Sequence, residues 1–335
     1  MSLRVGLLMD DAYDLDLIRA DLPGIDIERI AGWREDPSDR LAERLRAYDA
    51  LVTGRKSPRL PEELVADRGR LRLLAHCHGT IKHLASKAHL EAGLLVSNWG
   101  DQVAGVAEGA LALLLACLKQ LRALDACVRS GWQQDARIHQ DVPGSLIGAR
   151  VGLYGFGPIG RHMGRMLLAI GARPAIYDPY ATALPEGIGR CASLRELFAT
   201  CPFVSIHCGL NAGTENSVDA ALLALLPQGG ILVNTARGGV VVEEDLAAAL
   251  ASGRILAGID VIRDEKAWTS GPLAAIGSDR LILSGHIIGR GKGPDPAKPA
   301  PPRSLPAFVC GNLRALVAGA PLRNLVTAAE YDLKT

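Results

Sequence analysis

The spacing of hydrophobic and polar residues changes repeatedly along the first hundred residues. Short apolar runs of strand length alternate with stretches in which apolar residues recur every three or four positions, as on one face of a helix. The runs predict strands at 4–9, 25–30, 50–53, 71–75 and 94–97, and the intervening stretches predict helices at 15–22, 38–48, 61–67 and 82–92. Strands that alternate with helices are typical of parallel βαβ units.

The same alternation returns after residues 102–130, which predict one long helix that is apolar almost all round from Val106 to Leu118. Such a pattern indicates burial between layers. The later residues predict strands at 151–154, 203–207, 230–234, 256–260 and 281–284, with helices at 193–199, 219–225 and 243–252. Residues 290–306 contain six prolines and predict an extended loop before a closing helix at 307–318. The expected fold class is α/β, with two doubly wound parallel-sheet domains of the Rossmann or flavodoxin type.

The most specific local pattern is a glycine-rich turn between a predicted strand and a predicted helix. Gly155, Gly157 and Gly160 have G-x-G-x-x-G spacing directly after the strand at 151–154. The first glycine permits the tight turn, the second lets the backbone approach a pyrophosphate, and the third lets the helix pack closely on the strand. Free N–H groups at the helix start suit phosphates. We therefore expect a dinucleotide site here rather than a purely structural turn.

An acidic residue completes this unit and bears on the choice of cofactor. Asp178 lies 18 residues past Gly160, at the end of the next apolar run. Its carboxylate suits the ribose hydroxyls of NAD and repels a 2′-phosphate. The residues that follow, Pro179, Tyr180 and Ala181, supply no arginine for that phosphate. The pattern favours NAD over NADP.

Composition narrows the classes of partner and compartment. The 335 residues carry 37 Lys and Arg against 36 Asp and Glu, a net charge of +1, which argues against a general nucleic-acid or anionic-membrane partner. Seven cysteines, none of them in a C-x-x-C pair, favour a reduced, cytoplasmic interior. No signal peptide is expected, and the longest apolar stretch, 110–118, is far shorter than the ~20 residues of a membrane span.

Three polar side chains are expected at the carboxyl ends of successive strands, where doubly wound sheets bind ligands. They are Arg237, Glu265 and His286. An arginine suits a carboxylate because its planar fork donates two parallel hydrogen bonds, although an ion pair within the fold explains Arg237 equally well. A solvated acid and a structural histidine are the plainer interpretations of the other two. If they meet, however, the carboxylate would stabilise the charged imidazole that proton exchange with a substrate hydroxyl requires.

The motifs around these residues resemble those of the D-isomer-specific 2-hydroxyacid dehydrogenases, from about Leu71 to His286 and weakly toward both ends. They are N-T-A-R-G at 234–238, Asp260-Val261 followed by Glu265, H-I-I-G at 286–289, V-S-I-H at 204–207 and D-A-A-L-L-A-L-L at 219–226. The resemblance implies an NAD-dependent oxidoreductase for a small 2-hydroxy or 2-keto acid of D configuration. It also implies a homodimer formed through the nucleotide domains.

The resemblance implies a role for each matching residue. Arg237 would bind the substrate carboxylate, His286 would act as acid in keto reduction and as base in alcohol oxidation, and Glu265 would support His286. Backbone amides at Gly79 and Thr80 would bind the substrate. The acid at 265 argues against a formate dehydrogenase. The cofactor would contact Pro158 and Ile159 at the pyrophosphate and Cys208, Thr235, Ala236, Asp260, His286 and Gly289 elsewhere.

The turn that would bind substrate departs from the family's common G-x-G-x-D pattern. Residues 76–83 read H-C-H-G-T-I-K-H. This departure means that the sequence does not identify which acid is the substrate. The histidines here also suggest a metal site, but no acid or cysteine completes a ligand set and we expect none. Two other functions stay open: an NAD-binding regulatory protein of corepressor type, and a family enzyme for a substrate such as phosphite.

The predicted domains follow from these assignments. A discontinuous substrate domain comprises 1–98 and 290–335, and an NAD-binding Rossmann domain comprises 99–289. A cleft between them would close over the substrate about hinges near 98–101 and 287–290.

Overall fold

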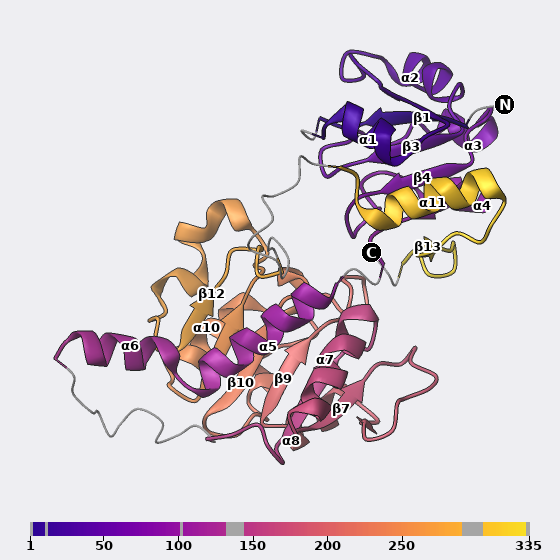
Figure 1. The fold of residues 1–335 in the computed structure, drawn as a ribbon. Coiled ribbons are helices and arrows are strands. Elements are labelled where there is room, and N and C mark those ends of the chain that lie inside the picture. The colour runs from indigo at the N-terminus through magenta and orange to yellow at the C-terminus, as the bar shows by residue number, and fades with distance from the viewer. Residues whose placement is uncertain (1–2, 11–12, 101–102, 132–143, 290–303, 333–335) are drawn as a thin grey trace. The chain divides into compact units, whose positions relative to one another are not determined.

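The computed structural model describes residues 3–10, 13–100, 103–131, 144–289 and 304–332. The chain divides into two compact units (Figure 1). Unit 1 is Met1–Gln102 with Lys292–Thr335, and unit 2 is Val103–Gly291. Of the expected hinge residues, Asp101 and Arg290 lie outside the described residues, as does 290–303 of the proline-rich segment.

Unit 1 contains a six-stranded sheet in the order β13-β5-β4-β3-β1-β2. Five strands are parallel, and β13 pairs antiparallel with β5 at one edge. The strands are β1 (Leu3–Leu8), β2 (Ile25–Arg29), β3 (Ala50–Thr53), β4 (Leu73–His76), β5 (Leu95–Ser97) and β13 (Leu325–Val326). The helices are α1 (Leu15–Asp21), α2 (Ser38–Leu45), α3 (Glu63–Ala66), α4 (Lys87–Glu91) and α11 (Ala307–Ala318).

Alternating side chains of this sheet fill two separate cores. Leu51 packs with Leu41 and Leu45 of α2 on one face, whereas Val52 packs with Ile18 of α1 and Leu313 of α11 on the other. Successive residues of a strand point to opposite faces, so consecutive apolar residues bury both faces of a parallel sheet. The closing helix α11 thus completes unit 1, although more than 200 residues separate it from β5.

Unit 2 contains a seven-stranded parallel sheet in the order β12-β11-β10-β9-β6-β7-β8. The strands are β6 (Arg150–Tyr154), β7 (Arg173–Tyr177), β8 (Gly189–Arg190), β9 (Phe203–Ile206), β10 (Gly230–Asn234), β11 (Ile255–Ile259) and β12 (Leu281–Leu283). The order reverses between β6 and β9, which is the point where ligands bind outside the carboxyl ends of an open parallel sheet.

Helices cover both faces of this sheet, and short 3₁₀ turns follow two of its strands. The helices are α5 (Ala104–Leu118), α6 (Leu121–Arg129), α7 (Pro158–Ala169), α8 (Leu194–Thr200), α9 (Ala220–Leu223) and α10 (Glu243–Ala251), with η1 (Gly238–Val240), η2 (Glu265–Ser270) and η3 (Pro272–Ala275). Side chains of α5 and α7 share one core, and those of α8 and α10 share the other. The α/β class with two parallel-sheet units is confirmed.

Several predicted helix bounds are wrong. The long helix expected at 102–130 is two helices, because Gln120 adopts a left-handed φ of 47° that ends the hydrogen-bond ladder after Lys119. The helix expected at 82–92 begins only at Lys87, where the backbone N–H of Ser86 donates to His89 Nδ1 and fixes the helix start. No helix in the described ranges is long and apolar enough to cross a membrane.

Candidate active site

The glycine loop has the geometry that a pyrophosphate needs. Gly155 has a φ of 96°, and a Cβ there would lie 2.6 Å from the backbone nitrogen of Cys208. A Cβ on Gly160 would lie 2.4 Å from the carbonyl oxygen of Gly155. At Gly157, the residue that precedes α7, a Cβ would meet nothing within 4 Å. The first and third glycines are therefore required by packing, whereas the second leaves space beside the start of α7, where Pro158 and Ile159 lie.

Asp178 ties the end of β7 to this loop. Its Oδ2 accepts the backbone N–H of Phe156 at 2.6 Å, and its Oδ1 accepts that of Tyr180 at 2.8 Å. The side chain is half-buried. Each carboxylate oxygen can accept a further hydrogen bond, so the arrangement still suits ribose hydroxyls.

The end of β9 brings a histidine that the sequence interpretation did not assign to the site. His207 is buried beside the glycine loop, and burial lowers its pKa to about 4, so the ring is neutral at neutral pH. Neither ring nitrogen has a hydrogen-bond partner among the described residues. The sequence feature that could have assigned His207 to the site is its position directly after the strand β9. The neighbouring Cys208 has a pKa raised to about 12 by burial and is a thiol, not a nucleophile.

The turn after β10 presents Thr235, Ala236 and Arg237. Asn234 shapes this turn, because its Nδ2 donates to the carbonyl of Arg237 at 2.9 Å and its Oδ1 accepts the N–H of Ala236 at 3.0 Å. The half-buried Arg237 donates from Nη1 to the carbonyl of Ala236 at 2.7 Å. The hydroxyl of Thr235 is buried and has no partner in the part of the chain that is described.

Asp260, at the end of β11, fixes the turn after β12. Its Oδ1 accepts the hydroxyl of Ser284 at 2.7 Å and the N–H groups of Ile287 and Ile288 at 3.1 and 3.2 Å. Its backbone oxygen accepts the N–H of His286 at 2.6 Å. This buried carboxylate therefore positions the segment that carries His286.

Glu265 and His286 meet. Glu265 begins η2, and its Oε1 lies 2.6 Å from Nδ1 of His286, which has a left-handed φ of 59° in the turn after β12. Both side chains remain partly exposed. Strands β10, β11 and β12 are adjacent and parallel. Arg237, Asp260 and His286 follow these three strands and therefore lie at the same carboxyl end of the sheet.

Gly289 has a packing role that the sequence motif did not reveal. A Cβ there would lie 2.6 Å from Cγ2 of Val106 in α5. The glycine lets the segment after His286 run closely against the start of that helix.

The predicted substrate turn belongs to unit 1. The carbonyl of Gly79 accepts Nδ2 of Asn98 at 2.7 Å, and a Cβ on Gly79 would lie 2.6 Å from Nε1 of Trp99. Thr80 follows in the same turn. The chain can therefore pass the indole of Trp99 only because residue 79 is a glycine.

Three histidines lie in and around this turn: His76 is buried, His78 is half-buried and His83 is exposed. His76 lies 3.0 Å from Thr53 Oγ1 through Nδ1, and its ring packs edge-on against His78 and His83 at centroid distances of 5.5 and 5.6 Å. Burial, followed by the charges of His78 and His83, lowers the pKa of His76 to about 3. Among the described residues no three His, Cys, Asp or Glu side chains come together as a metal site would require.

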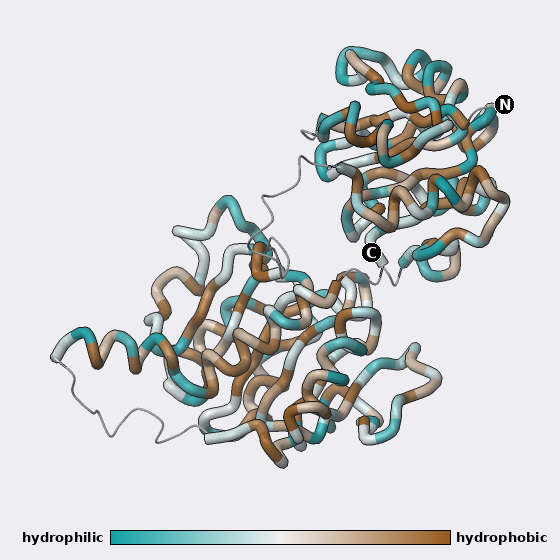
Figure 2. Tube along the Cα trace, in the orientation of Figure 1, coloured by the Kyte–Doolittle hydropathy of each residue, from teal (hydrophilic) through white to brown (hydrophobic). Residues whose placement is uncertain are grey.

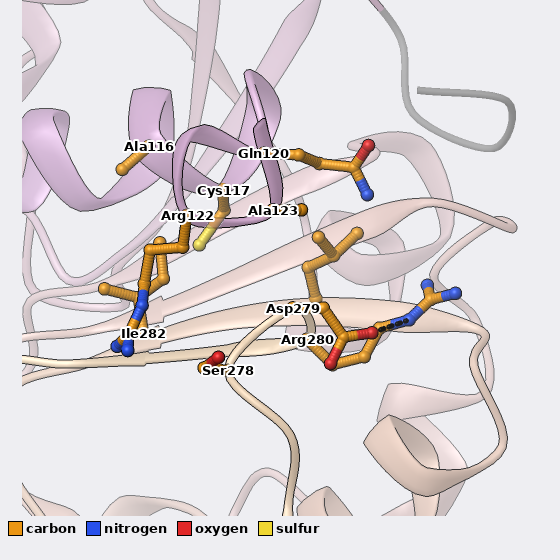
Figure 3. Close-up of a pocket in the computed structure, with 10 residues that line it drawn as sticks. Ala116, Cys117, Gln120, Arg122, Ala123, Ser278, Asp279, Arg280 and Ile282 are labelled. Atoms are coloured by element: carbon orange, nitrogen blue, oxygen red, sulfur yellow. Dashed lines mark ion pairs between the residues drawn. The ribbon is translucent and has the colours of Figure 1, made fainter. Parts of the chain in front are cut away.

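Two surface hollows of unit 2 are lined by residues other than Glu265 and His286. One lies between the α5–α6 junction and residues 278–282, where Asp279 and Arg280 form an ion pair at 3.7 Å (Figure 3). The other, of about 170 Å³, adjoins η2 and η3 and is lined by Trp268, among others. The predicted catalytic residues line neither hollow.

Comparisons with known proteins identify the family. Residues 111–287 match the family described as "D-isomer specific 2-hydroxyacid dehydrogenase, NAD binding domain". A D-3-phosphoglycerate dehydrogenase of Mycobacterium tuberculosis is 32% identical over 262 residues, which are 76% of this chain and 48% of that protein. A hydroxypyruvate reductase of Thermotoga maritima is 29% identical over 254 residues, 74% of this chain and 80% of that protein.

Solved structures share the fold. D-mandelate dehydrogenase of Rhodotorula graminis superposes with a TM-score of 0.79 at 22% identity, covering 97% of this chain and 98% of that one. A D-isomer specific 2-hydroxyacid dehydrogenase of Xanthobacter autotrophicus, solved with NADPH, gives a TM-score of 0.73 at 22% identity, covering 99% and 100%.

The chain spans about half the length of the phosphoglycerate dehydrogenases that it matches. The named relatives are dehydrogenases and reductases, so neither the regulatory function nor the phosphite substrate is favoured. The expected NAD site is confirmed, because the matched residues are the NAD-binding domain and make up more than half of the 335 residues. The chain therefore belongs to the D-isomer specific 2-hydroxyacid dehydrogenase family.

Proposed function

We propose that this chain is an NAD-dependent dehydrogenase that transfers a hydride between NAD(H) and a small 2-hydroxy or 2-keto acid of D configuration. The contact of 2.6 Å between His286 Nδ1 and Glu265 Oε1 carries the proposal. Two plainer explanations, a solvated acid and an isolated structural histidine, do not account for that contact. A carboxylate next to an imidazole stabilises the charged ring that delivers a proton to a substrate oxygen.

The residues of the glycine loop fit the cofactor. The open space at Gly157, the start of α7 and the acceptor capacity of Asp178 suit a pyrophosphate and a ribose. Pro158, Ile159, Cys208, Thr235, Ala236, Asp260, His286 and Gly289 would line the rest of the cofactor site. When bound, the nicotinamide supplies or accepts the hydride.

The chain's own residues then bind the acid and move the proton. Arg237 orients the substrate by pairing with its carboxylate, and the backbone amides of Gly79 and Thr80 provide a second anchor. Because Glu265 occupies Nδ1 of His286, proton exchange with the substrate oxygen takes place at Nε2. In reduction Nε2 donates the proton, and in oxidation it accepts one.

We assign the substrate turn to unit 1 and the cofactor to unit 2. This division follows the position of Gly79 in the first and of the glycine loop in the second. The relatives named for phosphoglycerate and hydroxypyruvate suggest short 2-hydroxy and 2-keto acids as the first compounds to test.

We also propose a homodimer that forms through α6. This helix has no buried residue, and its apolar side chains include Leu121 at 53% exposure and Val128 at 38%. Hydrophobic and hydrophilic residues alternate along it where it extends from the rest of unit 2 (Figure 2). If a two-fold axis passes next to Leu124, two copies of α6 pack antiparallel and Leu121 of one copy lies opposite Val128 of the other. In such an isologous contact the same surface of both copies must be complementary to itself.

A cytoplasmic location is proposed on the cysteines. All seven are free thiols, and five of them are buried, which suits a reducing compartment.

The proposal is tested by following NADH absorbance with a panel of 2-keto acids, and by repeating the panel with NADPH. We expect NADH oxidation with at least one short 2-keto acid and D configuration in the product. Tight NADH binding without turnover of any member of the panel would contradict the proposal.

A further inference from the structure

An arginine from a separate strand lies beside the expected ribose site. Arg190 ends the short edge strand β8, which pairs in parallel with β7 so that Arg190 lies opposite Ile176. Asp178 follows two residues after Ile176. Because the two strands are parallel, Arg190 and Asp178 both lie at the carboxyl end of this part of the sheet.

Hydrogen bonds hold Arg190 over the turn that carries Asp178. Its Nη1 donates to the carbonyl of Asp178 at 3.3 Å, and its Nη2 donates to the carbonyl of Ala181 at 2.5 Å. The residue is exposed. The guanidinium therefore binds the backbone of the 178–181 turn on the solvent side.

The carboxylate of Asp178 is anchored by different partners. Its two oxygens accept the backbone N–H groups of Phe156 and Tyr180, and no ion pair joins it to Arg190 in the described ranges. The carboxylate of Asp178 and the guanidinium of Arg190 therefore bond to the same turn without pairing with each other. A ribose hydroxyl suits the first, and a phosphate suits the second.

We propose that Arg190 is the binding partner for the 2′-phosphate of NADP, and that Asp178 alone keeps NADP from binding well. This inference rests on the cofactor site of the proposed function. The turn uses Nη1 and one N–H of Nη2, so the other edge of the guanidinium, Nε–H with the second N–H of Nη2, can offer a phosphate two parallel, charge-assisted hydrogen bonds. The carboxylate of Asp178 would repel the same phosphate.

This arginine is far from Asp178 in the sequence. Residues 179–181, which directly follow Asp178, include no arginine. The pairing of β7 with β8 instead supplies one from twelve residues farther along the chain.

The test measures the dissociation constants of NADH and NADPH by cofactor fluorescence, with no substrate present. The full-length variants are Asp178→Asn, Arg190→Gln and the double variant. Asn removes the charge and keeps one of the two accepting oxygens, so it retains the bond to either Phe156 or Tyr180. Arg173→Gln is the matched control, because Arg173 is also exposed and bonds a backbone carbonyl, that of Gly148, but at the opposite end of β7.

We expect Asp178→Asn to strengthen NADPH binding roughly tenfold, which corresponds to about 1.4 kcal/mol. Adding Arg190→Gln should reverse most of this gain and weaken NADPH far more than NADH, while Arg173→Gln should change neither cofactor. Two results would overturn the proposal. In the first, adding Arg190→Gln to Asp178→Asn leaves NADPH affinity unchanged. In the second, Arg190→Gln lowers the affinity for NADH and NADPH equally, which would mean that Arg190 only holds the turn. Because no acid is turned over, these results are independent of whether the chain reduces 2-keto acids.

Discussion

The backbone oxygen of Asp260 accepts the N–H of His286 at 2.6 Å, and the Asp260 carboxylate accepts three further donors from the same turn. The acid therefore controls where the proposed proton donor stands. Asp260→Ala would leave three partly buried donors without this partner, and a lost partner costs about 1–3 kcal/mol when the donor is fully buried and less when it is not.

We expect Asp260→Ala to lower the free energy of unfolding by about 3 kcal/mol and to reduce kcat as well. Urea denaturation and steady-state kinetics measure the two effects. Ser284→Ala removes only one donor and should cost about 1 kcal/mol. Full activity in Asp260→Ala would show that another contact positions His286.

The first two glycines of the loop should respond differently to alanine. Gly155→Ala places a Cβ at a φ of 96° against Cys208, so both folding stability and NADH binding should fall. Gly157→Ala meets open space, so stability should change by less than about 1 kcal/mol while NADH affinity falls roughly tenfold or more. Thermal melts and fluorescence titrations separate the two. Unchanged NADH affinity in Gly157→Ala would place the pyrophosphate elsewhere.

Much of this arrangement could be predicted from sequence, for a definite reason. The carboxyl ends of parallel strands all lie at one end of the sheet. Polar residues that follow the apolar runs are therefore expected there, and these include Arg237, Glu265 and His286. The break at Gln120 could not be predicted, since no glycine or proline marks it. Strands β8 and β13 have two residues each, too few to show a period, so the approach of Arg190 to Asp178 was also hidden.

Buried neutral histidines make stability depend on pH. Burial lowers the pKa of His207 to about 4 and that of His76 to about 3, against an ordinary value of 6.5. Below pH 6.5 the unfolded chain binds protons that the folded chain does not, so stability falls as the pH drops from 6.5 toward 4. Each group contributes roughly 1.4 kcal/mol per pH unit across this window.

His207→Gln and His76→Gln should each reduce this loss. The measurement is the free energy of unfolding in urea at pH 7 and pH 5, compared between variant and wild type. The change between the two pH values matters, since His76→Gln also loses its bond to Thr53. An identical pH dependence in all three proteins would mean that neither histidine is buried in its neutral form.

If the dimer forms through α6, one substitution in this helix should lower the molecular mass of the protein in solution. Leu121→Asp should convert dimer to monomer in sedimentation velocity, because the charge would be buried against the second copy. Val317→Asp is the control, since Val317 is similarly exposed at 58% but lies in α11 of unit 1. A dimer that survives Leu121→Asp would exclude α6 as the interface.

Glu265→Gln keeps the size of the side chain and removes its charge. The uncharged amide pairs with Nδ1 more weakly than the carboxylate does at 2.6 Å, so the ring is held less firmly and kcat for keto reduction should fall roughly tenfold. Steady-state kinetics with NADH and an accepted 2-keto acid measure this effect. A kcat equal to the wild-type value would show that Glu265 does not support His286.

In the proposed mechanism His286 exchanges the proton with the substrate oxygen. The direct measurement is single-turnover oxidation of NADH by an accepted 2-keto acid in His286→Gln, with circular dichroism to verify folding. We predict a rate at least roughly a hundredfold below wild type, in line with the loss of a general acid. A folded His286→Gln protein that reduces the acid at the wild-type rate would exclude His286 as the proton donor.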